Sequence, residues 1–214
     1  MIKNIVFDVG KVLVSFDAKS YMRKLGYNEI TCKSVNAAMF AHSTWNECDR
    51  GVLSTKELLE MYIANAPEYK KEIVEAFEKI GNMIYLLPHT MEWIQDLKNQ
   101  GYSLYVISNY GEYTFEQTKH KLEFLPYMDG AIFSYKYKMI KPDLPIYEQL
   151  LKEYHLKAEE CVFIDDRLDN VEASEKVGYH GIQFINYEQA KEELNKLLLE
   201  SAFCKTYYKS SNKK

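Results

Sequence analysis

Carboxylates, a lysine and a hydroxyl follow apolar runs or turns at four places in the chain. These side chains are Asp8, Ser108 with Asn109, Lys141, and the pair Asp165-Asp166. An acid at the end of a single strand is more typical of a turn than of a functional site. Parallel strands, however, deliver their carboxyl ends to one edge of a sheet, where ligands bind. Together the four segments would place carboxylates, an ammonium and a hydroxyl around one point.

That set of groups suits phosphoryl transfer. A phosphate ester repels an attacking carboxylate unless a divalent cation and fixed donors neutralise its charge. Asp8 and Asp166 offer the hard oxygen ligands that Mg²⁺ prefers. The phosphate oxygens would be held by the Lys141 ammonium, the Ser108 hydroxyl and the backbone amides of Val9 and Gly10. Asp8 as the nucleophile would form an aspartyl-phosphate that water then cleaves.

The elements that must position these residues alternate between helix and strand from residue 88 onward. Apolar runs predict strands over residues 102–108, 130–134, 161–164 and 181–185, after a first strand that ends at Asp8. Helices are expected over 88–100, 112–122, 144–154, 168–177 and 187–200. Such alternation implies right-handed crossovers. The predicted fold class is therefore α/β, with a Rossmann-like parallel sheet and helices on both of its faces.

The block between the first strand and residue 87 is helical, with no convincing strand. Phe16 and Asp17 are typical of a helix start, Ser54-Thr55-Lys56-Glu57 is a capping box, and Pro67 to Ile80 predicts a further helix. We expect residues 17–86 to form a helical cap inserted over the carboxyl edge of the sheet. The α/β core would then comprise residues 1–16 and 87–202, followed by a frayed tail over 203–214.

Composition argues against several classes of protein. The chain has 214 residues, 27% charged and 47% hydrophobic, as in an ordinary globular protein, and a net charge of −4 favours no nucleic-acid partner. The four cysteines form no C-x-x-C pair, so we expect no disulfide framework and a reducing cytoplasmic location. No apolar run reaches the roughly 18 residues of a membrane span, and Asp8 interrupts the first run, so we expect neither membrane association nor a signal peptide.

In their order and spacing the four segments resemble the motifs of the haloacid dehalogenase superfamily. The matching residues are Phe7 to Leu13, Ile107-Ser108-Asn109, Lys141-Pro142 and Phe163-Ile164-Asp165-Asp166. The chain is most similar to the branch that includes bacterial α-glucose-1-phosphate phosphatases and relatives of the epoxide hydrolase N-terminal domain. The resemblance implies a Mg²⁺-dependent phosphatase of small phosphomonoesters such as sugar phosphates, with a small helical cap. It adds Asp165 and the Gly10 carbonyl to the expected metal ligands.

The sequence departs from this family at Gly10. Phosphatases of the superfamily typically have a second Asp two positions after the nucleophile, acting as general acid and base. Such help is worth about 100- to 10,000-fold in rate. Asp17 at the entry to the cap and Asp49 within it are two candidates for the missing group. A sugar anomeric phosphate also needs less protonation of its leaving group than an alkyl phosphate does.

Four residues of the predicted cap are candidates for contacting the substrate: Trp45, Asn46, Asp49 and Arg50. Trp45 and Arg50 also have a structural interpretation, since a tryptophan often packs within a cap and an arginine often lies on the surface. The sequence leaves the choice open for these four positions.

Two other functions are compatible with the same motifs. A 2-haloacid dehalogenase would use the same aspartate without a metal, but the charges of Asp165 and Asp166 would then repel the nucleophile. A catalytically silent binding or regulatory protein could keep the fold. Such a protein would have no need of the charged Asp8, Lys141 and Asp166 at a buried edge.

Overall fold

The centre of the molecule is a five-stranded parallel sheet. The computed structural model describes the backbone of residues 1–211 and the side chains of residues 1–202. The strands are β1 (Asn4–Phe7), β2 (Ser103–Ser108), β3 (Gly130–Phe133), β4 (Cys161–Asp165) and β5 (His180–Gln183), in the order β3-β2-β1-β4-β5. Phe7 pairs with Val106 of β2 and Ile164 of β4. Asp8, the next residue, therefore lies at the carboxyl edge of the central strand.

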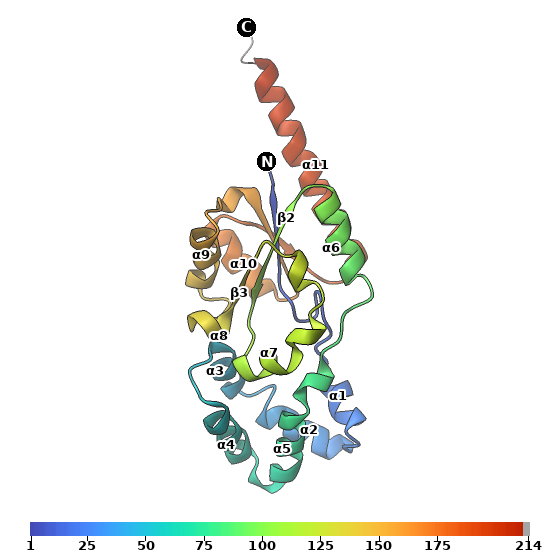
Figure 1. The fold of residues 1–214 in the computed structure, drawn as a ribbon, viewed down its shortest axis with the longest axis vertical. Helices are drawn as coiled ribbons and strands as arrows, with labels where there is room; N and C mark the ends of the chain where they lie inside the picture. Colours follow the sequence, from blue (N-terminus) through green and yellow to red (C-terminus); the bar gives the residue numbers. More distant parts are fainter. Residues whose placement is uncertain (212–214) are drawn as a thin grey trace.

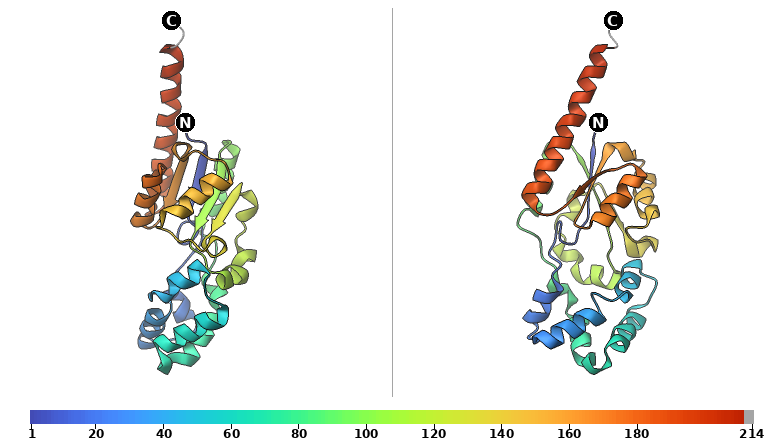
Figure 2. Two further views of the ribbon diagram at one scale, coloured as in Figure 1. Left: turned by 90° about the vertical axis from the view of Figure 1, so that its left-hand side faces the viewer. Right: turned by 180° about the vertical axis from the view of Figure 1, so that it is seen from behind.

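Alternate residues of the strands build two cores, one on each face of the sheet. On one face Ile5 and Phe7 pack with Trp93 of α6 (Thr90–Asn99) and with α11 (Tyr187–Ser211). On the other face Val6 and Phe163 pack with α9 (Leu144–Glu153) and α10 (Leu168–Val177). The two layers of helices are visible on either side of the sheet in Figure 2. The α/β fold predicted from alternation is thereby confirmed.

The helices between β1 and α6 gather beyond the carboxyl edge of the sheet (Figure 1). They are α1 (Ala18–Lys24), α2 (Glu29–Ala38), α3 (Thr44–Arg50), α4 (Thr55–Asn65), α5 (Lys70–Glu78) and the 3₁₀ turns η1 (Pro67–Tyr69) and η2 (Ile80–Met83). The Ser54–Glu57 capping box forms at the start of α4. Gly51 ends α3 with a φ of 66°, a left-handed conformation that suits glycine. We call residues 17–86 the cap.

Short elements complete the core around these layers. They are α7 (Glu112–Thr118), η3 (Lys119–Lys121), η4 (Leu125–Tyr127), α8 (Ser134–Tyr137) and η5 (Ala158–Glu160). Several boundaries differ by one or two residues from the sequence-based expectation, and three helices differ more. The helix expected over Pro67 to Ile80 divides into η1 and α5, and the one expected over 112–122 ends as α7 at Thr118. The closing helix continues to Ser211 through part of the expected tail, while 212–214 lie outside the described residues.

The contacts between the cap and the core include two groups of hydrogen bonds that lie near the carboxyl edge of the sheet. Near residue 15, the backbone N–H of Ser15 donates to the carbonyl of Tyr85 at 2.8 Å, and the Ser15 hydroxyl donates to the Met83 carbonyl at 2.8 Å. At the end of α3, the Ser134 hydroxyl of the core donates to the Asp49 carbonyl at 2.5 Å. These contacts fix the orientation of α3 over the edge of the sheet.

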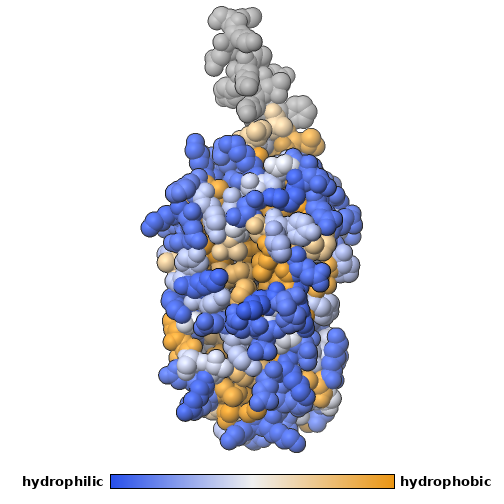
Figure 3. Space-filling model, in the orientation of Figure 1, coloured by the Kyte–Doolittle hydropathy of each residue, from blue (hydrophilic) through white to orange (hydrophobic). Residues whose placement is uncertain are grey.

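Polar side chains cover most of the face seen in Figure 3, with apolar ones scattered between them. Among the described residues, none of the helices combines the length and the apolar composition needed to cross a membrane.

Trp93 is the side chain whose loss we expect to damage the core most clearly. It is fully buried and meets the Phe7 ring edge-on, with 5.0 Å between ring centroids. Trp93→Ala should lower the free energy of unfolding by about 3 to 5 kcal/mol, because truncation leaves a cavity beneath the central strand. Urea denaturation measures this. Tyr127→Ala, at a side chain that is 40% exposed, should cost less than about 1 kcal/mol. Equal losses for the two variants would contradict the assignment of Trp93 to the main core.

Candidate active site

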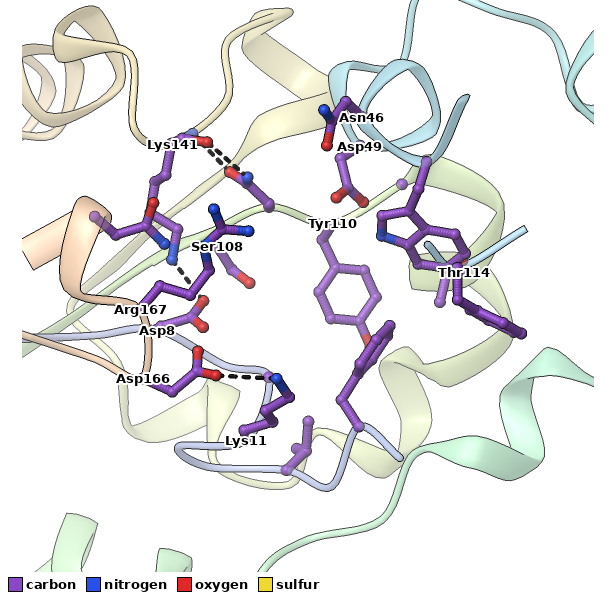
Figure 4. Close-up of a pocket in the computed structure, with 18 of the residues that line it drawn as sticks. Asp8, Lys11, Asn46, Asp49, Ser108, Tyr110, Thr114, Lys141, Asp166 and Arg167 are labelled. Atoms are coloured by element: carbon purple, nitrogen blue, oxygen red, sulfur yellow. Dashed lines mark hydrogen bonds and ion pairs between the residues drawn. The ribbon is translucent and has the colours of Figure 1, made fainter. Parts of the chain in front are cut away.

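A cavity of about 280 Å³ lies between the carboxyl edge of the sheet and the cap. This volume is close to the lower limit for small-molecule sites. Its lining combines residues from both sides: Asp8, Gly10, Ser108, Asn109, Lys141 and Asp166 from the core, and Phe40, Trp45, Asn46 and Asp49 from the cap. Figure 4 shows polar side chains from both sides directed into this space. The four segments predicted to meet at one edge therefore do meet there.

Asp8 leaves the central strand directly into this cavity. Its backbone N–H donates to the Ile164 carbonyl at 2.9 Å, which extends the pairing of β1 with β4 by one residue. Burial raises the pKa of Asp8 to about 6, while the Lys141 ammonium acts in the opposite direction. At pH 7 the side chain is still mostly a carboxylate, which is the form that a nucleophile requires.

Lys141 is the buried cation of the site. Its Nζ lies 2.7 Å from Asp8 Oδ1 and 2.6 Å from Asp165 Oδ2. Burial lowers the pKa of Lys141, but the two carboxylates outweigh this effect and the net shift is upward. The ammonium therefore stays charged and can face a phosphate.

Asn109 fixes the backbone of Lys141. Its Oδ1 accepts from the Lys141 backbone N–H at 2.8 Å, and its Nδ2 donates to the Lys141 carbonyl at 3.0 Å. This two-point contact joins the end of β2 to the segment that carries the lysine. Ser108, the last residue of β2, is almost fully buried and lines the cavity beside Asn109.

Asp165 and Asp166 differ in their surroundings although they are adjacent. Asp165 is fully buried, and its carboxylate accepts from Lys141 Nζ, from the Arg167 backbone N–H at 2.9 Å and from Asn170 Nδ2 at 3.0 Å. Asp166 lines the cavity, and its Oδ2 lies 3.1 Å from Lys11 Nζ. The first carboxylate thus orients Lys141, and the second is open to the cavity.

Three carboxylates lie close enough together to hold a metal ion. One oxygen each from Asp8, Asp165 and Asp166 lies within 4.8 Å of the others. A set of hard oxygen donors at a cavity wall suits a divalent cation such as Mg²⁺. Asp8 and Asp166 face the cavity, and Gly10 lines it as well. Because the Asp165 carboxylate already accepts three donors, its role as a ligand stays a prediction.

The cap residues predicted from sequence separate into two groups. Trp45, Asn46 and Asp49 line the cavity. Arg50 lies outside it, with Nη1 at 3.4 Å from Asp143 Oδ2 of the core, because it follows Asp49 onto another side of α3. Arg50 therefore belongs to the contact between cap and core.

The structure changes the expectation for Asp17 and is compatible with the backbone role expected for Val9. Asp17 lies outside the cavity, where its Oδ1 accepts from the Ser20 N–H at 3.0 Å and caps α1. It cannot be the group that replaces the acid absent at Gly10. The Val9 side chain is fully buried in the core, so only its backbone could contribute to the site.

Several residues that line the cavity were not identified from the sequence. They are Lys11, Val14, Phe16, Phe40, Ile84, Tyr110, Gly111, Thr114 and Arg167. Lys11 lies within the motif Phe7 to Leu13 and Arg167 directly follows Asp166, so their position along the chain could have indicated them. Lys11 also has a φ of 61°, which is uncommon for a residue with a side chain. The ring of Phe16 meets the ring of Trp45 at a centroid distance of 5.7 Å, a contact that only the folded chain reveals.

Comparisons with known proteins agree with this geometry. The model of the haloacid dehalogenase-like hydrolase family matches residues 13–185. A sesquiterpene phosphatase of Aspergillus oryzae is 26% identical over 92% of this chain and 96% of its own length. A D-ribitol-5-phosphate phosphatase of Bacteroides thetaiotaomicron is 25% identical over 92% of this chain and 99% of its own.

A solved structure supports the fold independently. A haloacid dehalogenase family enzyme from Bacteroides thetaiotaomicron, in complex with magnesium and inorganic phosphate, superposes with a TM-score of 0.67. The two chains are 18% identical, and the alignment covers 86% of this chain and 94% of the other. At that identity the likeness extends to the fold and not to the reaction.

Removing Lys141 should destabilise the protein strongly in metal-free buffer at pH 7. Lys141→Ala should lower the free energy of unfolding by about 3 to 5 kcal/mol, because it leaves Asp8 and Asp165 buried without a counter-charge. The deficit should shrink at pH 5. The pKa of Asp8 is already raised, and without the ammonium it rises further, so the folded variant gains stability as Asp8 takes up a proton.

Urea denaturation at the two pH values measures both effects. The control is Lys119→Ala, which removes an exposed pair with Glu116 and should cost at most about 1 kcal/mol. A Lys141→Ala loss no larger than that of the control would contradict the importance of the buried pair.

Proposed function

The chain belongs to the haloacid dehalogenase-like hydrolases, and we propose that within this family it is a Mg²⁺-dependent phosphatase of small phosphomonoesters. The reaction would pass through an aspartyl-phosphate on Asp8. The observation that carries the proposal is the position of Asp8 in the cavity, 2.7 Å from the buried Lys141 ammonium and beside the acids Asp165 and Asp166. Both curated relatives described above are phosphatases by name.

The residues of the core have distinct parts in this reaction. An oxygen of Asp8 attacks phosphorus as the bond to the leaving alcohol oxygen breaks, and water then attacks phosphorus and releases Asp8 and phosphate. Lys141 and Ser108 would hold the phosphate oxygens and stabilise their charge in the transition state. A divalent cation bound by Asp8, Asp166 and the Gly10 carbonyl would neutralise the repulsion between the carboxylate and the phosphate.

The acidic cluster favours a phosphatase over a dehalogenase. The dehalogenation of a 2-haloacid needs no metal ion, so it does not account for three carboxylates whose oxygens lie within 4.8 Å of one another. Without a bound cation those charges oppose the attack of Asp8 on a substrate that is itself anionic. The charged and buried Asp8 and Lys141 also argue against a catalytically silent protein.

We infer that the alcohol part of the substrate is small, such as a sugar or a sugar alcohol. The cavity of about 280 Å³ has room for only a few carbons beside the phosphate. Phe16, Phe40 and Trp45 form an aromatic group on the cap side, with Asn46 and Asp49 beside it. Aromatic faces suit the C–H faces of a sugar, and the polar side chains suit its hydroxyls. The ribitol phosphate named for one relative fits this class.

Asp8→Asn should abolish turnover, because an amide cannot attack phosphorus. The wild-type protein should release inorganic phosphate from a panel of sugar phosphates with Mg²⁺, and chelation with EDTA should stop the release reversibly. The matched control is Asp17→Asn, which keeps a side chain that can cap α1 and should leave the rate unchanged within about twofold. Release of halide from 2-haloacids without metal, and of phosphate from none of the esters, would overturn the proposal.

Lys11 should compete with Mg²⁺ for Asp166. Because its Nζ lies 3.1 Å from Asp166 Oδ2, Lys11→Met should free this carboxylate and tighten Mg²⁺ binding. The pair is exposed and worth at most about 1 kcal/mol, so we expect up to a fivefold lower Kd in isothermal titration calorimetry. Lys3→Met, which breaks a surface pair with Glu160 at the other end of the strands, should leave the Kd unchanged. Weaker binding by Lys11→Met would show that Lys11 does not oppose the cation.

A further inference from the structure

Asp49 is a carboxyl group in the cavity that the chemistry of Asp8 does not use. It lies in the last turn of α3 in the cap, and only 5% of the residue is exposed. Figure 4 shows its carboxyl directed into the cavity between Asn46 and Tyr110, with Asp8 and Lys141 across the space. The described residues place three carboxyl groups on the lining, and Asp49 alone comes from the cap side.

The backbone around Asp49 is held firmly against the core. The Asp49 carbonyl accepts from the Ser134 hydroxyl, which also accepts from the Tyr110 backbone N–H at 2.8 Å. A side chain on Gly111 would collide with Cys48 next to Asp49, so the loop after β2 and the end of α3 are in close contact. The backbone that carries the carboxyl group therefore has a fixed position relative to the sheet edge.

The environment of Asp49 differs from that of Asp8. Among the described side chains Asp49 forms no ion pair, whereas Asp8 has the Lys141 ammonium at 2.7 Å. Burial raises the pKa of Asp49 to about 8, and the nearby charge of Asp8 adds to this rise. Lys141, the Trp45 indole and the Gly111 backbone N–H act in the opposite direction without offsetting it. Cys48 and Tyr62 of the cap are also close and carry no charge at neutral pH.

Neither of the other two carboxyl groups on the lining suits proton transfer to a leaving alcohol. Asp8 must attack phosphorus on the side opposite the leaving oxygen, so it cannot also protonate that oxygen in the same step. Asp166 lies with Asp8 in the acidic cluster and pairs with Lys11. If the leaving group extends toward the cap, its oxygen lies on the side of the cavity that is away from Asp8 and Asp166 and that carries Asp49.

We propose that Asp49 is the acid–base residue of this site, in the role that a carboxyl at position 10 would otherwise fill. As the bond from phosphorus to the alcohol oxygen breaks, the Asp49 carboxyl gives its proton to that oxygen. The resulting carboxylate then takes a proton from the water that attacks the aspartyl-phosphate, which returns Asp49 to its acid form and releases phosphate. This inference rests on the proposed phosphatase function.

The test compares two leaving groups in Asp49→Asn, with Mg²⁺ present. An alkyl alkoxide needs a proton to leave, whereas 4-nitrophenolate leaves well without one. For an alkyl phosphate that the wild-type protein accepts, Asp49→Asn should lower kcat by about 100- to 10,000-fold. With 4-nitrophenyl phosphate the variant should release a burst of 4-nitrophenol near one equivalent per enzyme, followed by slow turnover. The burst arises because Asp8 is still phosphorylated but water attack lacks its base.

The burst also shows that the variant is folded and that its nucleophile works. A purely structural role of Asp49 predicts equal losses with both substrates and no burst, and this result would overturn the inference. The control is Asp17→Asn, at a cap carboxylate outside the cavity, which should show neither the selective loss nor the burst. If the wild-type protein hydrolyses neither substrate nor any other phosphate ester, the proposed function itself fails, independently of Asp49.

Discussion

The contact of Lys141 with Asp8 and Asp165 is the interaction on which the rest of the site depends. A lysine ammonium and two carboxylates share an almost water-free position, where each charge would be costly without the others. The sheet places the two acids on neighbouring strands, and the Asn109 side chain positions the backbone of the lysine. The same arrangement that compensates these buried charges leaves an ammonium and a carboxylate facing a cavity, which is what a phosphate site requires.

Much of the core and of this contact could be predicted from the sequence. Apolar runs followed by Asp8, Ser108 and Asp165 predicted the parallel strands, because a short continuous apolar run is typical of a strand that is buried on both faces. The capping box at Ser54 was also predicted correctly, since its hydrogen bonds join residues that are close in the sequence. The end of α11 was not predicted, because beyond residue 200 the sequence has no residue that typically ends a helix and no clear apolar periodicity.

Which residues of the cap face the cavity could not be predicted from the sequence. Arg50 and Asp49 are adjacent in the chain, yet one pairs with Asp143 outside the cavity and the other faces the site. Which side of α3 points inward depends on the contact of α3 with Ser134 and with the loop at Gly111, and both are distant in sequence. The aromatic group of Phe16, Phe40 and Trp45 likewise joins three separate segments. The residues that recognise the alcohol part of a substrate are thus fixed by tertiary packing, while those that handle the phosphate follow local motifs.

The central position of β1 has a consequence for how the chain reaches this structure. Asn4 pairs with Ser103 on one side and with Cys161 on the other, so the first strand has no partner until about half of the 214 residues have been synthesised, and it gains its second partner only with β4. Pairings of such high sequence separation close late and slow the folding of a domain. The apolar strand that carries the nucleophile is also the segment that must wait longest for a partner. During synthesis it is the part of the core most in need of protection from pairing with other chains.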